Sequence, residues 1–529
     1  MRGGVSAIAD SGRRAAAALA VAVTLAGCAS QSESLAPASA ETPYVPNVAE
    51  SAPPPPGVAD YGLPPQADMP IDLPKPAVDP RRAYTLPELV DIAESSNPAT
   101  KAAWERARQA ALAVGVVESA YLPRLSAQVL GGYQYASQSN PSVEISSSAL
   151  PGVDISLPGA LAAGSYETSA QATEVVPGVT MEWLLFDFGG RAAATESARQ
   201  LSIASNVVFN GAHQKLIYDV ASTFYQFTAA RAQVAIATET LANAKVVYAA
   251  AQSRCERGIA TTIEVAQAKQ QVAQAELGLV ESQGFERDGY HALLKAMGVA
   301  PTLAIKVQDV SSRPLPRAPA IDLDRLIEAA LRRRPDAQAA FARMKADQSN
   351  VDRARSDFLP RIAATGALDR NIGQGSVTDT LTTLTTRTRV DAPNADAFVL
   401  LSVPIYDGGV RDAQLRAAQA QASAAANELA QLQNAGAQEI VAAYDALRTS
   451  LAAFAAASEL VAASKLTAAA ARDYYDHGLG TLTEATSAQT ALLQAELAKA
   501  KAHSDALTAA ATIAFASGAL TNRDALDAR

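Results

Sequence analysis

Hydrophobic and polar positions alternate along four segments of this 529-residue chain. In the first, the odd-numbered positions from Leu125 to Tyr135 are apolar or small, and mostly polar or small residues lie between them. The same alternation occurs around Trp183, Leu368 and Val399. A period of two predicts β-strands with one apolar and one polar face. Such strands suit a membrane barrel with a wet lumen, and they suit a soluble antiparallel sheet equally well.

The stretches between these strands predict solvent-facing loops. Residues 136–168 and 370–396 are rich in Ser, Thr, Gly and Pro, which favour turns and irregular connections. We therefore expect the strands to end near residues 135 and 369 and to resume near 169 and 397.

A helical period dominates the rest of the chain. From Gly190 to Arg254 there are 65 residues without proline, which as a helix would extend about 100 Å. Apolar side chains recur in it at spacings of three and four, which is typical of a coiled-coil seam. The seam residues are Ile217, Val220, Phe224 and Phe227, and Ile440 and Tyr444 are the counterparts of Val220 and Phe224 later in the chain.

The pattern occurs twice. Tyr121-Leu122-Pro123-Arg124 returns as Phe358-Leu359-Pro360-Arg361, and the segment Leu185–Arg191 returns as Ile405–Arg411. The second of these pairs is separated by 220 residues, and so are Gly258 and Gly478. Each half therefore predicts a helix, two strands, a long helix, a tip and a returning helix. The expected fold is mainly α-helical, with four strands per chain and an internal two-fold sequence repeat.

Glycine interrupts the long helices at matching places. A glycine can take the left-handed conformation that ends a helix, and a following threonine can cap the next one. In the first half we expect Gly258 to end the helix and Thr261 or Thr262 to start the return. In the second half the candidates are Gly478 or Gly480, and Thr481 or Thr483. Gly189-Gly190 and Gly408-Gly409 are expected to turn strand into helix.

The N-terminus predicts export. Arg2, Arg13 and Arg14 precede an apolar run, Ala15 to Ala26, that is too short to span a membrane. The run ends in Leu25-Ala26-Gly27-Cys28, which resembles the bacterial lipobox, so lipidation of Cys28 at the outer membrane is implied. An ordinary signal peptide with a chance cysteine is the alternative. No other segment has 18 uninterrupted apolar residues, so any further membrane crossing requires strands.

The amino-acid composition and net charge limit the kinds of partner that the protein can bind. The chain is 49% hydrophobic but only 5% aromatic, and abundant alanine favours long, closely packed helices. A net charge of −9 argues against nucleic acid as a partner, because phosphate binding needs basic patches.

Candidate chemistry is sparse, and an enzyme is the weakest of three functional classes. His213, His291, His477 and His503 are scattered, without metal-ligand spacing. No nucleophile elbow or phosphate loop stands out, so we predict no catalytic residue, metal or cofactor. Cys255 is expected to be a small packing residue.

In duplicated order, these motifs resemble the TolC family of outer-membrane channels, in particular its lipidated members. The motifs are Asn97-Pro98 and Arg334-Pro335, the two strand entries, the strand exits Phe186-Asp187 and Tyr406-Asp407-Gly408-Gly409, and the two Gly-x-x-Thr tips. The resemblance covers about residues 84 to 520. It implies a homotrimer in which each chain gives four strands to a twelve-stranded β-barrel and its long helices to a periplasmic tunnel.

The resemblance also implies roles for the tips. Gly258, Thr261, Gly478 and Thr481 would dock a periplasmic membrane-fusion adaptor of an inner-membrane pump. Glu264, Glu484 and Tyr475 would form the aperture gate, with each glutamate repeated three times around the pore. A glutamate in the first helical turn is also favoured by the helix dipole alone. Gly480 stands where the family places a gating arginine.

The function expected from this resemblance is a passive exit duct of a tripartite efflux or type I secretion system in the outer membrane. A lipid-anchored coiled-coil structural or adhesive protein without a channel is the alternative, although it does not account for alternating strands that occur twice. The expected organisation is a lipoprotein signal peptide (1–27), a Pro/Ser/Ala-rich tether (28–83), a first repeat (84–298), a linker (299–320), a second repeat (321–520) and a C-terminal tail (521–529).

Overall fold

The computed structural model describes residues 36–37, 39, 62–63, 65–140, 166–316, 322–379 and 385–520. The chain divides into two units, Met1–Leu73 and Pro74–Arg529, and the second contains the helices and strands. The predicted signal peptide, Cys28, most of the tether and the tail 521–529 lie outside the described residues.

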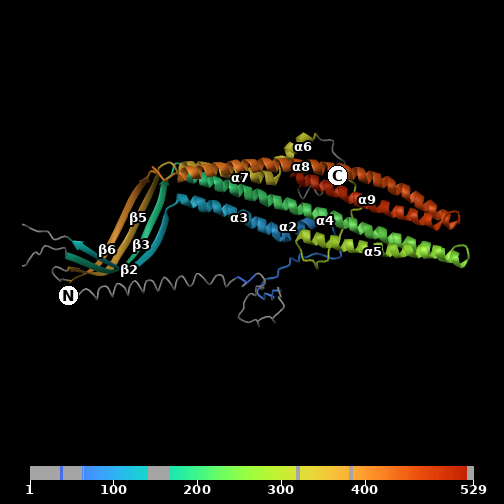
Figure 1. Ribbon diagram of the computed structural model, residues 1–529, viewed down its shortest axis with the longest axis horizontal. Coiled ribbons are helices and arrows are strands. Elements are labelled where there is room, and N and C mark those ends of the chain that lie inside the picture. The colour runs from blue at the N-terminus through green and yellow to red at the C-terminus, as the bar shows by residue number, and fades with distance from the viewer. Residues whose placement is uncertain are drawn as a thin grey trace, which may run out of the picture. The chain divides into compact units, whose positions relative to one another are not determined.

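The same order of elements occurs in both halves of the second unit (Figure 1). The first half contains α2 (Leu86–Ser96), α3 (Pro98–Glu118), β2 (Arg124–Asn140), β3 (Tyr166–Phe186), α4 (Gly190–Glu256) and α5 (Thr262–Met297). The second contains α6 (Leu323–Leu331), α7 (Pro335–Ser356), β5 (Arg361–Asp379), β6 (Thr385–Ser402), α8 (Val410–Asp476) and α9 (Leu482–Ala516). Short pieces complete the set: β1 (Ala83–Tyr84), η2 (Ser119–Tyr121) and β4 (Lys306–Val307). Both α4 and α8 have 67 residues.

The single helix predicted at the start of each half is in fact two helices. Pro98 and Pro335 each occupy the first position of a new helix, where the missing N–H costs nothing. The Asn97 side chain caps α3 by accepting from the Ala99 N–H at 2.8 Å. Proline disfavours a helical residue before it, so the preceding helix ends there.

The four long strands form one antiparallel sheet in the order β2-β3-β5-β6. They are longer than predicted, because β2 reaches Asn140, β3 begins at Tyr166, β5 reaches Asp379 and β6 begins at Thr385. Most of 370–396 is therefore strand rather than loop, and the prediction was wrong there. Ser, Thr and Gly are weak turn signals when a neighbouring strand satisfies each backbone group. Conversely, the alternation of Val399, Leu401, Val403 and Ile405 predicts a strand that continues to Ile405, whereas β6 ends at Ser402.

The register aligns the predicted apolar positions across all four strands. Leu125 faces Met181, which faces Gly366, and that residue faces Ala397. One step outward, Ala127, Val179, Leu368 and Ala395 form the next row. The sheet therefore has one largely apolar face, on which Arg370 and Asp391 form an ion pair, and the opposite face carries the polar rows.

The duplicated strand–helix motifs form the same junction twice. Gly189 and Gly409 have φ of +95° and +90°, a region that favours glycine, and each is the residue immediately before a long helix. Arg191 forms an ion pair with Asp187 at 3.4 Å and lies over the Tyr121 ring at 4.6 Å. In the second half, Arg411 pairs with Asp407 at 2.6 Å and lies over the Phe358 ring at 5.5 Å. The repeated motifs thus fasten each strand pair to its long helix.

The main apolar core lies where α2, α4, α5 and α9 meet. The predicted seam residues Ile217, Val220, Phe224 and Phe227 are all buried there, and Ile440 is fully buried in a smaller cluster on α8. Among the described residues, α8 is the one helix with an 18-residue window apolar enough to cross a membrane, with a mean hydropathy of 1.3 and 17% of the window buried. Alanine supplies much of that hydropathy, and one such helix by itself is weak evidence for a span.

Candidate functional site: the two hairpin tips

The tip of the first helical hairpin lies between α4 and α5. Gly258 has a φ of +72°, and the N–H groups of Ile259 and Ala260 both donate to the Arg254 carbonyl, at 2.9 and 3.3 Å. These bonds satisfy a carbonyl that the end of α4 leaves open. Thr261 then begins α5 as its N-cap.

The second tip, between α8 and α9, is built in the same way. Gly478 has a φ of +76°, and the N–H groups of Leu479 and Gly480 donate to the Tyr474 carbonyl at 2.8 and 3.1 Å. Thr481 is the N-cap of α9. Of the alternatives left open by the sequence, the structure selects Gly478 over Gly480 as the left-handed residue, Thr481 over Thr483, and Thr261 over Thr262.

Glu264 and Glu484 complete a capping box at each tip. The Thr261 hydroxyl accepts from the Glu264 N–H at 3.3 Å, and the Glu264 carboxylate accepts from the Thr261 N–H at 3.2 Å. The corresponding distances for Thr481 and Glu484 are 3.2 and 2.9 Å. The hydrogen bond from the Thr481 backbone N–H, and after it the interaction of the Thr481 side chain with the carboxylate, lower the pKa of Glu484. Both glutamates therefore have a local structural role in starting their helices.

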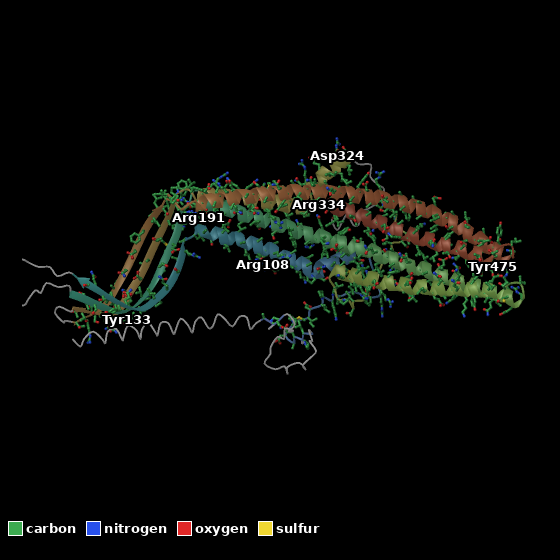
Figure 2. The ribbon with its side chains drawn as sticks, in the orientation of Figure 1. Arg108, Tyr133, Arg191, Asp324, Arg334 and Tyr475 are labelled. Carbon is green, nitrogen blue, oxygen red and sulfur yellow. The ribbon has the colours of Figure 1, made fainter. Side chains whose placement is uncertain are left out.

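Arg254 joins the two tips, a contact that the sequence did not suggest. Its Nη1 donates to the Tyr475 carbonyl oxygen at 2.6 Å, and its guanidinium lies 4.8 Å from the centre of the Tyr475 ring. Only 2% of the Tyr475 surface is exposed. Burial, followed by the charge of Glu264, raises the pKa of the Tyr475 hydroxyl, so it is neutral at physiological pH. Figure 2 shows Tyr475 at the far end of the helical hairpins.

The space around this contact is incompletely packed. Tyr475 lines a hollow of about 390 Å³ between the two hairpins, whose other walls are mostly Gln, Thr, Asn and Ala side chains. The Tyr475 hydroxyl and the Arg254 Nε have no hydrogen-bond partner among the residues that the structure describes. Gly480 is confined, because a Cβ there would lie 3.2 Å from the Tyr474 Cβ and 3.4 Å from a Glu484 carboxylate oxygen. The Arg254–Tyr475 contact is thus a discrete link across a loosely filled gap.

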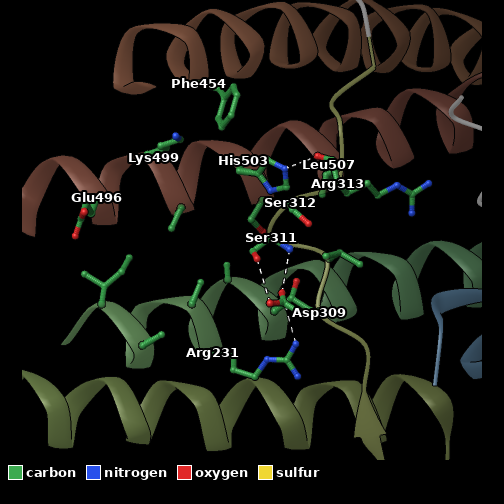
Figure 3. Close-up of a pocket in the computed structure, with 18 of the residues that line it drawn as sticks. Arg231, Asp309, Ser311, Ser312, Arg313, Phe454, Glu496, Lys499, His503 and Leu507 are labelled. Carbon is green, nitrogen blue, oxygen red and sulfur yellow. Dashed lines mark hydrogen bonds and ion pairs between the residues drawn. The ribbon is translucent and has the colours of Figure 1, made fainter. Parts of the chain in front are cut away.

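A larger hollow, about 720 Å³, lies between the linker and helices α4, α8 and α9 (Figure 3). Several of its charged side chains are paired within the protein: Arg231 with Asp309 at 3.6 Å, and Lys465 with Glu496 at 3.2 Å. The His503 Nε2 donates to the Arg313 carbonyl at 2.8 Å. These contacts hold the linker against the helices.

The four histidines considered in the sequence analysis do not form a cluster in the structure. His213 lies 3.3 Å from Glu94, far along the chain from His503 and the linker. Within the described ranges, no three His, Cys, Asp or Glu side chains are grouped in a way that could hold a metal ion. Cys255 is half-buried next to the first tip.

Comparison with known proteins gives the class of this protein and then its family. The fold matches the solved outer-membrane channel CusC with a TM-score of 0.66 at 19% identity, covering 87% of this chain and 98% of that one. This likeness shows that the chain has the fold of CusC. The model of the family "Outer membrane efflux protein" matches residues 89–299 and again 326–519. The chain therefore belongs to the outer membrane efflux protein family.

Proteins that are similar in sequence support this family assignment. Protein CyaE of Bordetella pertussis is 24% identical over 424 residues, covering 79% of this chain and 81% of CyaE. Outer membrane protein OprJ of Pseudomonas aeruginosa is 26% identical over 278 residues, covering 51% of this chain and 53% of OprJ. The match thus spans about half the length of OprJ. The protein is an outer-membrane channel for efflux or secretion, as the TolC-like motifs predicted, and its family consists of channel proteins.

Proposed function

We propose that three copies of this chain form one twelve-stranded barrel that continues into a helical conduit. The observation that carries this proposal is the sheet order β2-β3-β5-β6, which leaves one long edge open on β2 and another on β6. Unpaired backbone groups cannot face lipid, and four strands are too few to close a barrel. Pairing β6 of one copy with β2 of the next satisfies both edges, and three copies give twelve strands.

The apolar face of the sheet has the height of a bilayer. It extends from the Ile362–Leu401 pair to the Val175–Ile372 pair, which is about 34 Å along the strand and about 26 Å after a tilt of roughly 40°. The two outermost rows of this stretch contain one ion pair, Arg370 with Asp391. Trp183 lies near its inner end and Tyr133 beyond its outer end, as expected for aromatic girdles. These features support an outward-facing apolar surface in contact with lipid.

The opposite face of the sheet supports a water-filled lumen. Ser126 and Thr180 share a hydrogen bond at 2.7 Å across β2 and β3. Asn371 donates to Glu174 at 3.0 Å, and Asn394 donates to Asp369 at 3.1 Å. Polar networks of this kind are stable where water completes them.

The helical hairpins would extend through the periplasm, with the Gly258–Thr261 and Gly478–Thr481 tips docking a periplasmic adaptor of an inner-membrane pump. Glu264, Glu484 and Tyr475 would surround the aperture. Lipidated Cys28 would add a second anchor, with residues 28–83 as the tether. Since the chain offers no energy-coupling site that we recognise, conduction would be passive, with energy supplied by the pump.

The experiment that tests this proposal combines mass and conductance. Purified protein in detergent should have the mass of three chains, show heat-modifiable migration in which a slower trimer band before heating becomes a monomer band after it, and form ion-conducting pores in a planar bilayer. A monomer without conductance would overturn the barrel and would favour a coiled-coil envelope protein. Heat-unfolded protein is the control for non-specific leakage.

A measurement in cells can distinguish between the possible classes of cargo. We would compare the accumulation of a lipophilic cationic dye in energised cells with and without this gene. Higher accumulation in the deletion would support multidrug efflux. Unchanged accumulation with an intact outer membrane would favour secretion of a protein or export of a narrower substrate such as a metal ion, the latter in keeping with a relative named "Cation efflux system protein CusC".

A further inference from the structure

Two cross-strand rows beyond the apolar band place tyrosine and arginine side chains on the same face of the sheet. In the first row Tyr133 lies opposite Thr173, which is followed by Gln374 and Arg389. In the second row Tyr135 is followed by Gln171, Ser376 and Arg387. Figure 2 marks Tyr133 at the end of the sheet away from the helices. The apolar face thus ends in a cationic and aromatic rim, which we call the outer rim.

The two arginines of the outer rim are unpaired. Both are exposed, and neither forms an ion pair or side-chain hydrogen bond with the residues that the structure describes. The nearest acid on this face is Asp391, one row inward from Arg389. Arg370 binds Asp391 with two hydrogen bonds of 2.7 and 3.0 Å, and the charge of Arg389 acts on the same carboxylate only as a lesser influence. On this face the inner charges therefore cancel, whereas the two outer positive charges remain.

The shape of the outer rim suits the headgroup of a lipid. An open hollow of about 540 Å³ lies over these rows, lined by Tyr133, Gln171, Thr173, Gln374, Ser376, Arg387 and Arg389 among others. Tyr133 and Tyr135 remain 63% and 58% exposed, so their rings are available to contact a ligand. Guanidinium groups bind phosphate through two parallel hydrogen bonds. Tyrosine rings prefer the level of lipid headgroups.

We propose that the outer rim binds the phosphate groups of lipids in the outer leaflet of the membrane, with Arg387 and Arg389 as the phosphate ligands and Tyr133 and Tyr135 packing against the lipid. The inference rests on the proposed barrel, which turns this face toward lipid and places the rim at the headgroup level. In a trimer, three such rims surround the barrel. Each would hold bound lipid beside the junction where β6 of one copy pairs with β2 of the next.

The test uses purified full-length protein in nanodiscs and a phosphorylated glycolipid as the probe. Lipid A with both phosphates is titrated in and retained lipid is counted by native mass spectrometry. The variant is Arg387→Gln/Arg389→Gln, which keeps a polar side chain at each position, although a shorter one, and removes the charge. The control is Arg325→Gln/Arg332→Gln, which removes two charges from exposed side chains at α6, away from the sheet. Dephosphorylated lipid A is the matched probe.

We expect the rim variant to retain lipid A at least about tenfold more weakly than the wild type, in a salt-sensitive manner, and the control to be unchanged. Wild-type protein should hold dephosphorylated lipid A as weakly as the variant holds the phosphorylated form. Equal retention by variant and wild type, or no preference for the phosphorylated probe, would overturn the inference. Competition by inorganic phosphate at equal concentration would also overturn it, because the site would then take free phosphate.

Conductance separates this inference from the proposed function. The rim variant should still form trimers and pores in a planar bilayer, since Arg387 and Arg389 face away from the proposed lumen. A wild-type protein that conducts but shows no lipid preference would overturn the lipid site alone. A wild-type protein that forms neither trimers nor pores would overturn the barrel itself.

Discussion

The Arg254 guanidinium donates a 2.6 Å hydrogen bond to the Tyr475 carbonyl oxygen and lies 4.8 Å from the centre of the Tyr475 ring. The two residues belong to different hairpins, α4–α5 and α8–α9, and they meet beside a hollow between them. Any motion that separates the tips must break this contact. Arg254 therefore places a cation between the two tips, with its Nη2 3.7 Å from where a Cβ on Gly478 would lie.

Replacing Arg254 should loosen the closed tips. Arg254→Gln removes the charge that lies over the Tyr475 ring and shortens the reach to its carbonyl. We expect a several-fold higher open probability in planar bilayers, because a charge-assisted hydrogen bond with a cation–π contact contributes about 1–3 kcal/mol.

Two matched variants sharpen that test. Arg257→Gln changes a neighbouring exposed arginine whose Nε bonds only within its own helix, to Ser253, and should leave gating unchanged. Tyr475→Phe keeps both the ring and the carbonyl and removes a hydroxyl without a partner, so it should also gate normally. Unchanged opening in Arg254→Gln would mean that the contact does not restrain the tips.

A side chain at the tip glycines should impair export. Gly258→Val and Gly478→Val force a β-branched residue into a left-handed conformation, which costs roughly 1–2 kcal/mol or more. The tips would reshape, so cellular dye efflux or secretion should fall while trimer mass stays normal. Gly278→Ala, in open space on the interior of α5, is the control. Normal export by both valine variants would remove the tips as the docking site.

Acid should loosen the start of α9. The folded-state pKa of Glu484 is lowered by the Thr481 hydrogen bonds, so its stabilising effect is complete above its ordinary value of 4.5 and is lost as the pH falls through the lowered value. Hydrogen exchange in the first turn of α9, corrected for intrinsic rates, should show less protection at pH 3 than at pH 6. Glu484→Gln, which cannot titrate there, should lose this pH dependence, and a variant that keeps it would assign the effect to another group.

Charge and capping at the tip glutamates can be separated. Glutamine still serves in a capping box, so Glu264→Gln/Glu484→Gln should keep the fold while removing six negative charges from a trimer. If these carboxylates surround the aperture, the reversal potential in a salt gradient should move toward zero as cation preference weakens. If the reversal potential does not change, the Glu264 and Glu484 carboxylates have only the helix-capping role.

Cys28→Ala should abolish lipidation without abolishing the trimer. The proposed barrel anchors the chain by itself, so the variant should remain in the outer-membrane fraction, and mass spectrometry should show an unmodified N-terminal peptide. Complete loss from the membrane would contradict the barrel as the main anchor. An unmodified peptide from the wild type would show that Cys28 is not a lipid anchor.

Much of this architecture follows from local pattern. The two 67-residue helices, the glycine–threonine tips and the apolar face of the strands were all readable, because each depends on residues close together in the chain. The strand ends were misjudged, since the Ser- and Thr-rich segments around Gly373 and Thr388 are held by pairing with each other. Such pairing is not visible in either segment alone.

The sequence by itself thus determined the duplicated order of elements, the tip chemistry and the family, since periodicity, capping and glycine φ preferences act within a few residues. Only the tertiary structure decided which distant residues meet. Arg254 and Tyr475 are 221 residues apart, and their contact depends on how two hairpins pack. Tyr133 and Arg389 share a row only because three successive strand registers bring them there, and a shift of one residue would send either side chain to the other face.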